Sequence, residues 1–289
     1  MYKGGKQKMK LLKPTSEIYI PDGTNIDKAL ERTTHLGIGA HQDDLEIMGY
    51  AGIYECFGRN DKWFTGVVAT NGAGSPRAGI YANYTDEEMQ KIRRIEQKKA
   101  AVVGEYSAVI FLDYSSSEIK SPKLTDPVED IKQIILKTKP QVIYTHNPAD
   151  KHDTHVATMI KTITALKQLP KEVLPKKIYG CECWRDLDWM LDEDKVVFDV
   201  SERDNIATSL VGLFDSQISG GKRYDLATMA RRRANATFFA SHGVDVSTYM
   251  IYAIDLTPVI VESVDIIEYT TQFINRFKDD VIQRLKKML

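Results

Sequence analysis

Three polar side chains with metal-binding chemistry follow an apolar run near the start of the chain. The run 36–40 predicts a buried strand, and His41, Asp43 and Asp44 come directly after it, where a helical pattern begins. In open α/β sheets, ligands bind at the carboxyl ends of the strands. His41 and Asp44 are three residues apart on a turning backbone, so both can face one ion, while Asp43 must point elsewhere in the same pocket. On these residues alone, helix capping by the two aspartates is an equally good interpretation.

A second polar cluster follows the apolar run 141–145. It holds His152 and His155, three residues apart, together with His146 and two acids. One His and one Asp from the first loop and a His from the second make three ligands, the number that a catalytic zinc site uses with water in the fourth position. No cysteine lies near either loop in the sequence, which disfavours a closed structural zinc site. The alternative is that these histidines are exposed loop residues.

Strand-like runs alternate with helical patterns along most of the chain. Apolar runs predict strands near 35–40, 64–70, 108–112, 141–145, 177–183, 195–200 and 249–254. Helical spacing predicts helices near 85–103, 125–136, 155–168, 202–216 and 223–240. This order predicts a Rossmann-like, doubly wound α/β fold with a mostly parallel sheet and helices on both faces.

The chain divides into three predicted parts. Residues 1–34, broken by prolines, form an irregular leader, and 35–260 form the main domain. Residues 261–289 carry the apolar stripe of an amphipathic helix. We expect this helix to dock on the chain's own core, with docking on another subunit as the alternative.

The composition is that of an ordinary globular protein. The chain has 289 residues, 43% hydrophobic, with a formal net charge of -1, so charge gives no argument for nucleic acid as a partner. Three cysteines are too few for a disulfide framework. Cys181 and Cys183 could form a soft metal site, but strand alternation favours a place in the core for both. With no signal peptide and no segment of membrane-spanning length, we expect a cytoplasmic protein.

Four sequence motifs are similar to those of the PIG-L/LmbE-like family of zinc-dependent N-acetylglucosaminyl deacetylases. Residues 40–46, Ala-His-Gln-Asp-Asp-Leu-Glu, resemble its Ala-His-Pro-Asp-Asp-x-Glu motif, and 150–155, Asp-Lys-His-Asp-Thr-His, resemble its Asp-x-His-Pro-Asp-His motif. The Arg-Arg-Ile-Glu segment 93–96 and the Ser-Gln pair 216–217 match weaker motifs. The resemblance spans roughly residues 35–243, with the motifs in the family's order.

The resemblance implies a role for each of six residues. It implies zinc ligands at His41, Asp44 and His155, a general base at Asp43, an oxyanion-stabilising imidazole at His152 and a sugar hydroxyl or phosphate contact at Arg93. These roles are chemically compatible with one another. Zinc lowers the pKa of a bound water, and a nearby carboxylate can accept the proton. Without the resemblance, Arg93 would be expected on a solvated helix face.

Two departures from the family pattern occur within these motifs. Gln42 replaces a proline, for which we expect a loss of turn rigidity only. Asp153 and Thr154 replace Pro-Asp, so the acid that precedes the last histidine is missing. In the family this acid helps to keep the catalytic imidazole charged. Here Asp150 or Asp153 could do the same for His152.

The predicted function is zinc-dependent removal of the acetyl group from an N-acetylated amino sugar or its conjugate. Another divalent metal such as Fe2+ is an alternative cofactor. The expected partner is a small N-acetylated sugar or glycoconjugate rather than nucleic acid or membrane, and a homo-oligomer is possible. Alternative functions are hydrolysis of another amide conjugate, or non-catalytic sugar or nucleotide binding with a degenerate metal site.

Overall fold

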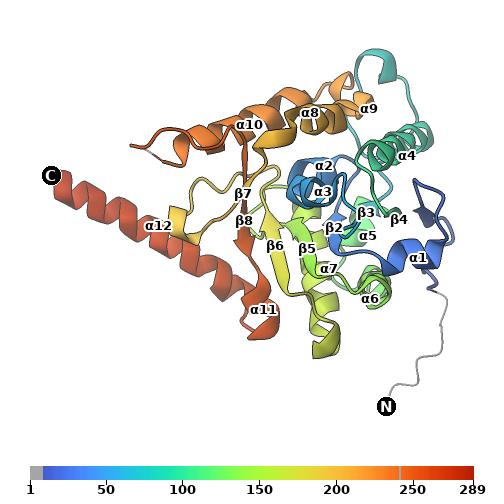
Figure 1. Ribbon diagram of the computed structural model, residues 1–289, viewed down its shortest axis with the longest axis horizontal. Coiled ribbons are helices and arrows are strands. Elements are labelled where there is room, and N and C mark those ends of the chain that lie inside the picture. Colours follow the sequence, from blue (N-terminus) through green and yellow to red (C-terminus); the bar gives the residue numbers. More distant parts are fainter. Residues whose placement is uncertain (1–8, 241) are drawn as a thin grey trace.

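The chain folds around an eight-stranded sheet with the order β1-β4-β3-β2-β5-β6-β8-β7 (Figure 1). The computed structural model describes residues 9–240 and 242–289. The strands are β1 (Glu17–Tyr19), β2 (His35–Gly39), β3 (Phe64–Thr70), β4 (Ala108–Tyr114), β5 (Val142–His146), β6 (Lys177–Cys181), β7 (Val196–Asp199) and β8 (Met250–Asp255). The central strands β4, β3, β2, β5 and β6 are parallel, while β1 and β8 pair antiparallel with their neighbours. The predicted mostly parallel α/β sheet is confirmed.

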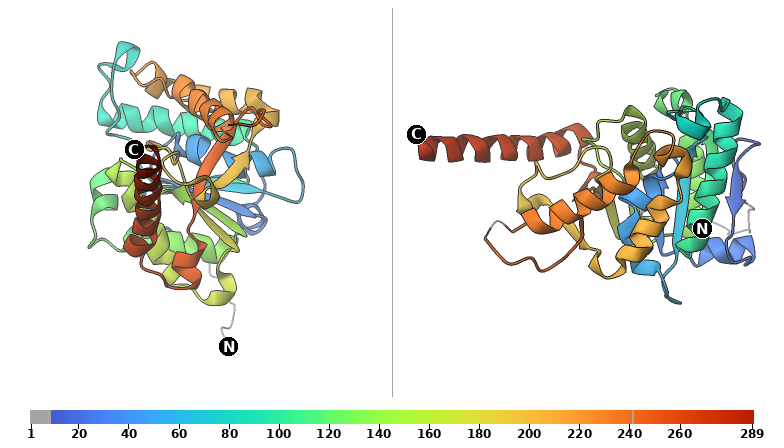
Figure 2. Two further views of the ribbon diagram at one scale, coloured as in Figure 1. Left: turned by 90° about the vertical axis from the view of Figure 1, so that its left-hand side faces the viewer. Right: turned by 90° about the horizontal axis from the view of Figure 1, so that it is seen from above.

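Helices cover both faces of the sheet (Figures 1 and 2). The helices are α1 (Ile26–Glu31), α2 (Asp44–Met48), α3 (Tyr50–Cys56), α4 (Asp86–Val103), α5 (Ser116–Lys120), α6 (Asp126–Thr138), α7 (Asp153–Lys167), α8 (Asp204–Gly212), α9 (Asp215–Ile218), α10 (Tyr224–Phe238), α11 (Thr257–Val261) and α12 (Ile266–Met288). Short 3₁₀ turns lie at Gly79–Tyr81, Lys171–Val173, Asp192–Asp194 and Ser201–Arg203. The predicted helix at 202–216 is divided into α8 and α9.

Two buried apolar clusters, one on each face, hold the layers together. On one face Leu36 and Ile38 of β2 pack with apolar residues of α6 and α7. On the other face Leu45 of α2 packs with residues of α3, α4 and α8. Burial of these surfaces is the main favourable term for the fold. It also fixes where the helices begin relative to the strand ends.

The predicted irregular leader contains regular structure in its described part. β1 pairs antiparallel with the edge strand β4, with Ile18 opposite Ile110, and α1 buries Ala29 and Leu30. The expectation of an irregular segment is therefore wrong for this part, because the prolines at 14 and 21 flank β1 rather than interrupt it. The first eight residues of that predicted leader lie outside the described residues.

Helix α12 extends away from the body of the molecule (Figure 2). Its first half is attached, since Phe273 is buried and the Tyr269 hydroxyl donates a 2.6 Å hydrogen bond to the Asp255 carbonyl. Farther along, Val281 and Leu285 are exposed. The expected docking on the chain's own core is therefore confirmed for the first half of the helix and wrong for the outer half. In the part of the chain that the structure describes, none of the helices has the length and apolarity needed to cross a membrane.

Candidate metal and active site

The two polar clusters meet at the point where the order of the strands reverses. From β2 the chain continues to β3 and β4 on one side of the sheet, whereas β5 and β6 lie on the other side. β2 and β5 are parallel neighbours, so their carboxyl ends open at the same edge. Such a switch point is the usual ligand crevice of open α/β sheets.

A close approach of α2 to the sheet sets the position of the first motif. At Gly66 a Cβ atom would lie 2.5 Å from Leu45 Cδ1, and at Gly39 it would lie 3.0 Å from Asp44 Cβ. Asp43 itself has a left-handed backbone with φ of 88°, an uncommon conformation for a residue other than glycine. Side chains at these two glycine positions would push α2, and with it Asp44, away from the strand ends.

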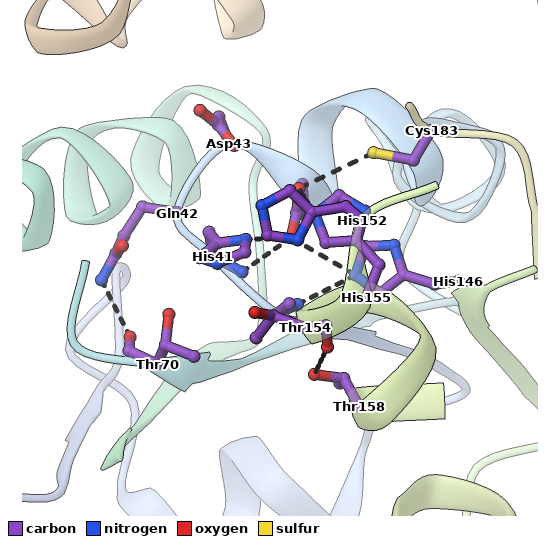
Figure 3. Close-up of polar contacts among 12 residues, drawn as sticks. His41, Gln42, Asp43, Thr70, His146, His152, Thr154, His155, Thr158 and Cys183 are labelled. Carbon is purple, nitrogen blue, oxygen red and sulfur yellow. Dashed lines mark hydrogen bonds and ion pairs between the residues drawn. The ribbon is translucent and has the colours of Figure 1, made fainter. Parts of the chain in front are cut away.

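Asp44 is the centre of the site. Its carboxylate lies 3.3 Å from His41 Nδ1, 3.3 Å from His146 Nε2 and 3.4 Å from His155 Nε2, and it accepts a 2.6 Å hydrogen bond from the His41 backbone N–H. Burial raises the pKa of this carboxyl, but His155 and His146 outweigh burial and hold the pKa well below its ordinary value. The structure therefore brings together the three predicted ligands His41, Asp44 and His155. Figure 3 shows His41 and His155 in this cluster.

The His155 imidazole has the character of a metal ligand. The side chain is fully buried, and neither ring nitrogen has a hydrogen-bond partner among the described residues. Its Nδ1 lies 3.5 Å from Asp150 Oδ2, which gives the ring a carboxylate on the side opposite Asp44. Burial lowers the pKa of His155, yet Asp44 and Asp150 together raise it above its ordinary value. A buried imidazole between two carboxylates fits a divalent cation.

Two residues that were not among the predicted ligands also lie in this cluster. His146 is fully buried, stacks on His155 with ring centroids 4.0 Å apart, and accepts a 3.0 Å hydrogen bond from the Ala40 N–H at Nε2. Cys183 Sγ lies 3.7 Å from Asp44 Oδ1. The expected place of Cys183 in the core is confirmed, and the fold in addition brings its thiol to the site, which its position in the sequence did not indicate. β6 ends at Cys181, so strand alternation does not reach position 183. For His146, a place at the end of a strand, like that of His41, was the available sequence signal.

These side chains form two overlapping groups with metal-ligating atoms. One group is His41, His152 and His155, and the other is His146, Asp150, His155 and Cys183; in each, the ligand atoms lie within 4.8 Å of one another. Asp44 contacts members of both groups. The first group with Asp44 offers nitrogen and oxygen ligands, whereas the second offers four ligands including sulfur.

His152 faces the same cavity from the start of α7. Its ring lies 5.0 Å from that of His41 and 4.5 Å from that of His155, centroid to centroid. Burial and the neighbouring His155 lower the pKa of His152. Asp150 accepts a hydrogen bond from the His152 backbone N–H, but the imidazole Nδ1 has no partner among the described residues. In the described chain neither Asp150 nor the exposed Asp153 forms a hydrogen bond or ion pair with this ring, although the charge of each opposes the lowering of its pKa.

Asp43 points away from the histidine cluster (Figure 3). Its carboxylate is buried and lies 3.5 Å from the Arg93 guanidinium, and Oδ2 has no hydrogen-bond partner in the described chain. Burial raises the pKa of Asp43 well above its ordinary value, although Arg93 opposes this. A carboxylate with a raised pKa can both accept and return a proton.

Arg93 lies in the interior, so the solvated-face interpretation is wrong. Its side chain is 4% exposed and donates hydrogen bonds to the Gln42 carbonyl at 2.7 Å, the Gly72 carbonyl at 3.3 Å and the Ser75 hydroxyl. The guanidinium thus joins the loop after β2 to the loop after β3. Gln42 strengthens the same junction, because its amide donates to the Thr70 carbonyl at 3.2 Å. The substitution of proline by Gln42 therefore adds a contact besides changing the turn.

The two weaker motifs contact each other. Glu96 accepts hydrogen bonds from the Ser216 backbone N–H at 2.7 Å and from the Ser216 hydroxyl at 2.6 Å. This buried contact attaches α9 to α4 beside the Arg93 junction. Their role in the structure is to hold helices around the site.

Comparison with protein families gives a match over part of the chain. Residues 36–166 match the PIG-L family model, described as GlcNAc-PI de-N-acetylase. No curated protein sequence matches the chain.

Solved structures with the same fold include enzymes of different reaction types. The 4-carboxy-2-hydroxymuconate hydratase GalB from Pseudomonas putida KT2440 is 16% identical with a TM-score of 0.60, over 81% of this chain and 100% of that chain. The N,N'-diacetylchitobiose deacetylase from Pyrococcus horikoshii is 17% identical with a TM-score of 0.57, over 76% of this chain and 83% of that chain. The A40926 pseudoaglycone deacetylase Dbv21 is 17% identical with a TM-score of 0.56, over 78% of this chain and 97% of that chain. At these identities the likeness concerns the fold. The PIG-L family match applies to residues 36–166.

Proposed function

We propose that this protein is a zinc-dependent hydrolase that removes the acetyl group from an N-acetylated amino sugar or its conjugate. The observation that carries the proposal is the placement of Asp44 between His41 and His155, with both His155 ring nitrogens buried and without a hydrogen bond in the described chain. A buried imidazole whose ring nitrogens make no hydrogen bond is costly unless a cation completes the site. The PIG-L family match and the deacetylases among the structural neighbours support an amide substrate.

In this proposal His41, Asp44 and His155 would hold the ion. When bound, a divalent cation polarises the amide carbonyl and acidifies water. The Asp43 carboxylate accepts a proton from the attacking water, whose oxygen bonds to the acyl carbon. The C–N bond then breaks, and Asp43 returns the proton to the leaving nitrogen, so the products are acetate and a free amine. His152 donates a hydrogen bond to the acyl oxygen as negative charge develops there.

Metal content and acetate release test the proposal together. We expect about one zinc per chain in the purified protein by elemental analysis, and acetate release from at least one sugar in a panel of N-acetylated amino sugars and their conjugates. His155→Ala should lose both the metal and the activity. The exposed His242, far along the chain from both motifs, provides the matched control, and His242→Ala should keep both.

The possible outcomes separate the candidate functions. Absence of metal after zinc is added back would contradict the hydrolase proposal and leave a sugar- or nucleotide-binding protein. Metal without acetate release, but with hydrolysis of another amide, would assign the chain to amidases on other conjugates.

A further inference from the structure

A pocket of about 300 Å³ lies directly beside the site. Cys183 and Trp184 line it on the side of the site, and Lys222, Tyr224 and Arg231 line it from the segment that leads into α10 and from α10 itself. Its volume suits a group the size of a sugar substituent. The mechanism proposed above uses none of these side chains.

The pocket and the site share a wall. Cys183 contacts Asp44 at 3.7 Å, and the Trp184 ring lies 5.7 Å from the His152 ring. The Trp184 backbone N–H donates a 3.0 Å hydrogen bond to Asp150 Oδ2, the carboxylate that also faces His155. A molecule whose amide lies at His152 can therefore extend along Trp184 into the pocket.

The lining of the pocket is strongly basic. It contains five basic residues, Lys151, Lys222, Arg223, Arg231 and Arg232, and a single acid, Glu182. The whole chain has a formal net charge of only -1, so this excess is local.

Three of these cations form no ion pair within the described part of the chain. Arg223 pairs with Asp225 at 2.7 Å, and the buried Arg232 donates to backbone carbonyls. By contrast, no carboxylate of the described chain forms an ion pair with Lys151, Lys222 or Arg231. Unpaired cations around a hollow attract an anion.

Two of the cations, Lys222 and Arg231, are half-buried and are held in position by contacts with the pocket wall. Lys222 Nζ lies 5.1 Å from the centroid of the Trp184 ring, over its face, and the Tyr224 ring lies 6.1 Å from the same ring. Arg231 donates to the carbonyls of Cys183 and Trp184, which fixes the guanidinium against the wall shared with the site. Positioned cations bind an oxyanion better than freely moving surface lysines do, because less side-chain entropy is lost.

We propose that this pocket binds an oxyanion substituent, a phosphate ester or a carboxylate, on the amine-bearing portion of the substrate. Lys151 and Lys222 supply the charge, and Trp184 supplies the apolar face between the anion and the amide. This inference rests on the proposed function in one respect: the molecule that occupies the pocket is taken to be the one that is hydrolysed. The anion preference itself is a property of the pocket.

Binding of sugars that lack an amide tests the pocket independently of hydrolysis. The zinc-loaded full-length protein is titrated with glucose, glucose 6-phosphate and glucuronate by isothermal calorimetry. We expect at least one of the two anionic sugars to bind about ten-fold more tightly than glucose, with an advantage that shrinks at high salt. Comparison of glucose 6-phosphate with glucuronate then shows whether the pocket prefers a phosphate ester or a carboxylate.

Charge-removing variants locate the effect. Lys151→Met combined with Lys222→Met should reduce the ratio of anionic-sugar to glucose affinity to about two-fold or less. The matched control combines Lys167→Met with Lys176→Met, two exposed lysines at the opposite end of α7 and β6, and it should retain the advantage.

Equal affinity for all three sugars in the unaltered protein would overturn the inference. So would an anion advantage that survives in the pocket variant or is lost equally in the control. If charge-dependent binding is present but no amide is hydrolysed, the proposed function fails and the anion pocket stands.

Discussion

Asp44 Oδ1 and His155 Nε2 lie 3.4 Å apart, although one residue begins α2 and the other lies in the first turn of α7. The contact exists because β2 and β5 are parallel neighbours at the switch point of the sheet. It places a carboxylate with a lowered pKa next to an imidazole with a raised one, and both are buried. The predictions below test what this arrangement and its surroundings do.

Asp43 is expected to act in proton transfer rather than in metal binding. Asp43→Asn should keep the metal content unchanged and lower kcat for acetate release by about 10²- to 10⁴-fold, because the amide cannot accept the proton. Asp153→Asn is the control, since Asp153 is exposed and should leave kcat within about two-fold. Full activity of Asp43→Asn would show that the base is a different group.

Cys183 separates the two candidate ligand sets. If His41, Asp44 and His155 hold the metal, Cys183→Ser should bind metal as the unaltered protein does, and the cobalt-substituted protein should lack thiolate-to-cobalt charge-transfer absorption. Loss of metal in Cys183→Ser, or a thiolate band in the cobalt protein, would instead favour the group with His146 and Asp150.

Arg93 is expected to contribute to stability as well as to substrate affinity. Arg93→Met removes the donor for two buried carbonyls and should lower the free energy of unfolding by about 2–4 kcal/mol, measured by urea denaturation. Arg94→Met is the matched control, because the Arg94 side chain is 24% exposed and pairs with Glu17 and Asp113 near the surface; we expect a loss of about 1 kcal/mol or less.

An increase in KM of Arg93→Met beyond the matched control, in protein that remains folded at the assay temperature, would support the proposed sugar contact of Arg93. An unchanged free energy of unfolding would contradict the role of Arg93 in joining the two loops.

Asp130 provides a pH-dependent test far from the metal ligands in the sequence. Its buried carboxylate accepts hydrogen bonds from the Tyr114 hydroxyl at 2.7 Å and the Leu12 N–H at 2.9 Å, and burial raises its pKa. Since the folded-state pKa lies above the unfolded one, the associated stability is fully present below about pH 4 and is lost as the pH rises through the folded value.

Asp130→Asn should therefore gain stability relative to the unaltered protein as the pH rises from about 4 to about 7. Urea denaturation across this range measures the difference. Asp186→Asn, at an exposed position far along the chain from Asp130, should show no such trend. A difference independent of pH in Asp130→Asn would contradict the raised pKa.

The order of the strands and helices could be read from local patterns. The apolar run 64–70 coincides with β3, and the helix predicted near 85–103 coincides with α4, where Thr85 and Glu88 form a reciprocal cap. Such signals are local, because side-chain periodicity and capping depend on neighbours within a few residues. The same is true of the spacing that suggested His41 with Asp44 as ligands.

Contacts between segments far apart in the chain depend on the tertiary structure and cannot be read from local patterns. His146 and Cys183 enter the site because β5 and β6 end beside β2, and Arg93 becomes buried because two loops close over it. The exposed outer half of α12 is a further case, since an amphipathic stripe does not tell what it packs against. Local sequence specifies which side chains are available for chemistry. The packing of the sheet determines which of them meet, because burial and proximity depend on the whole fold.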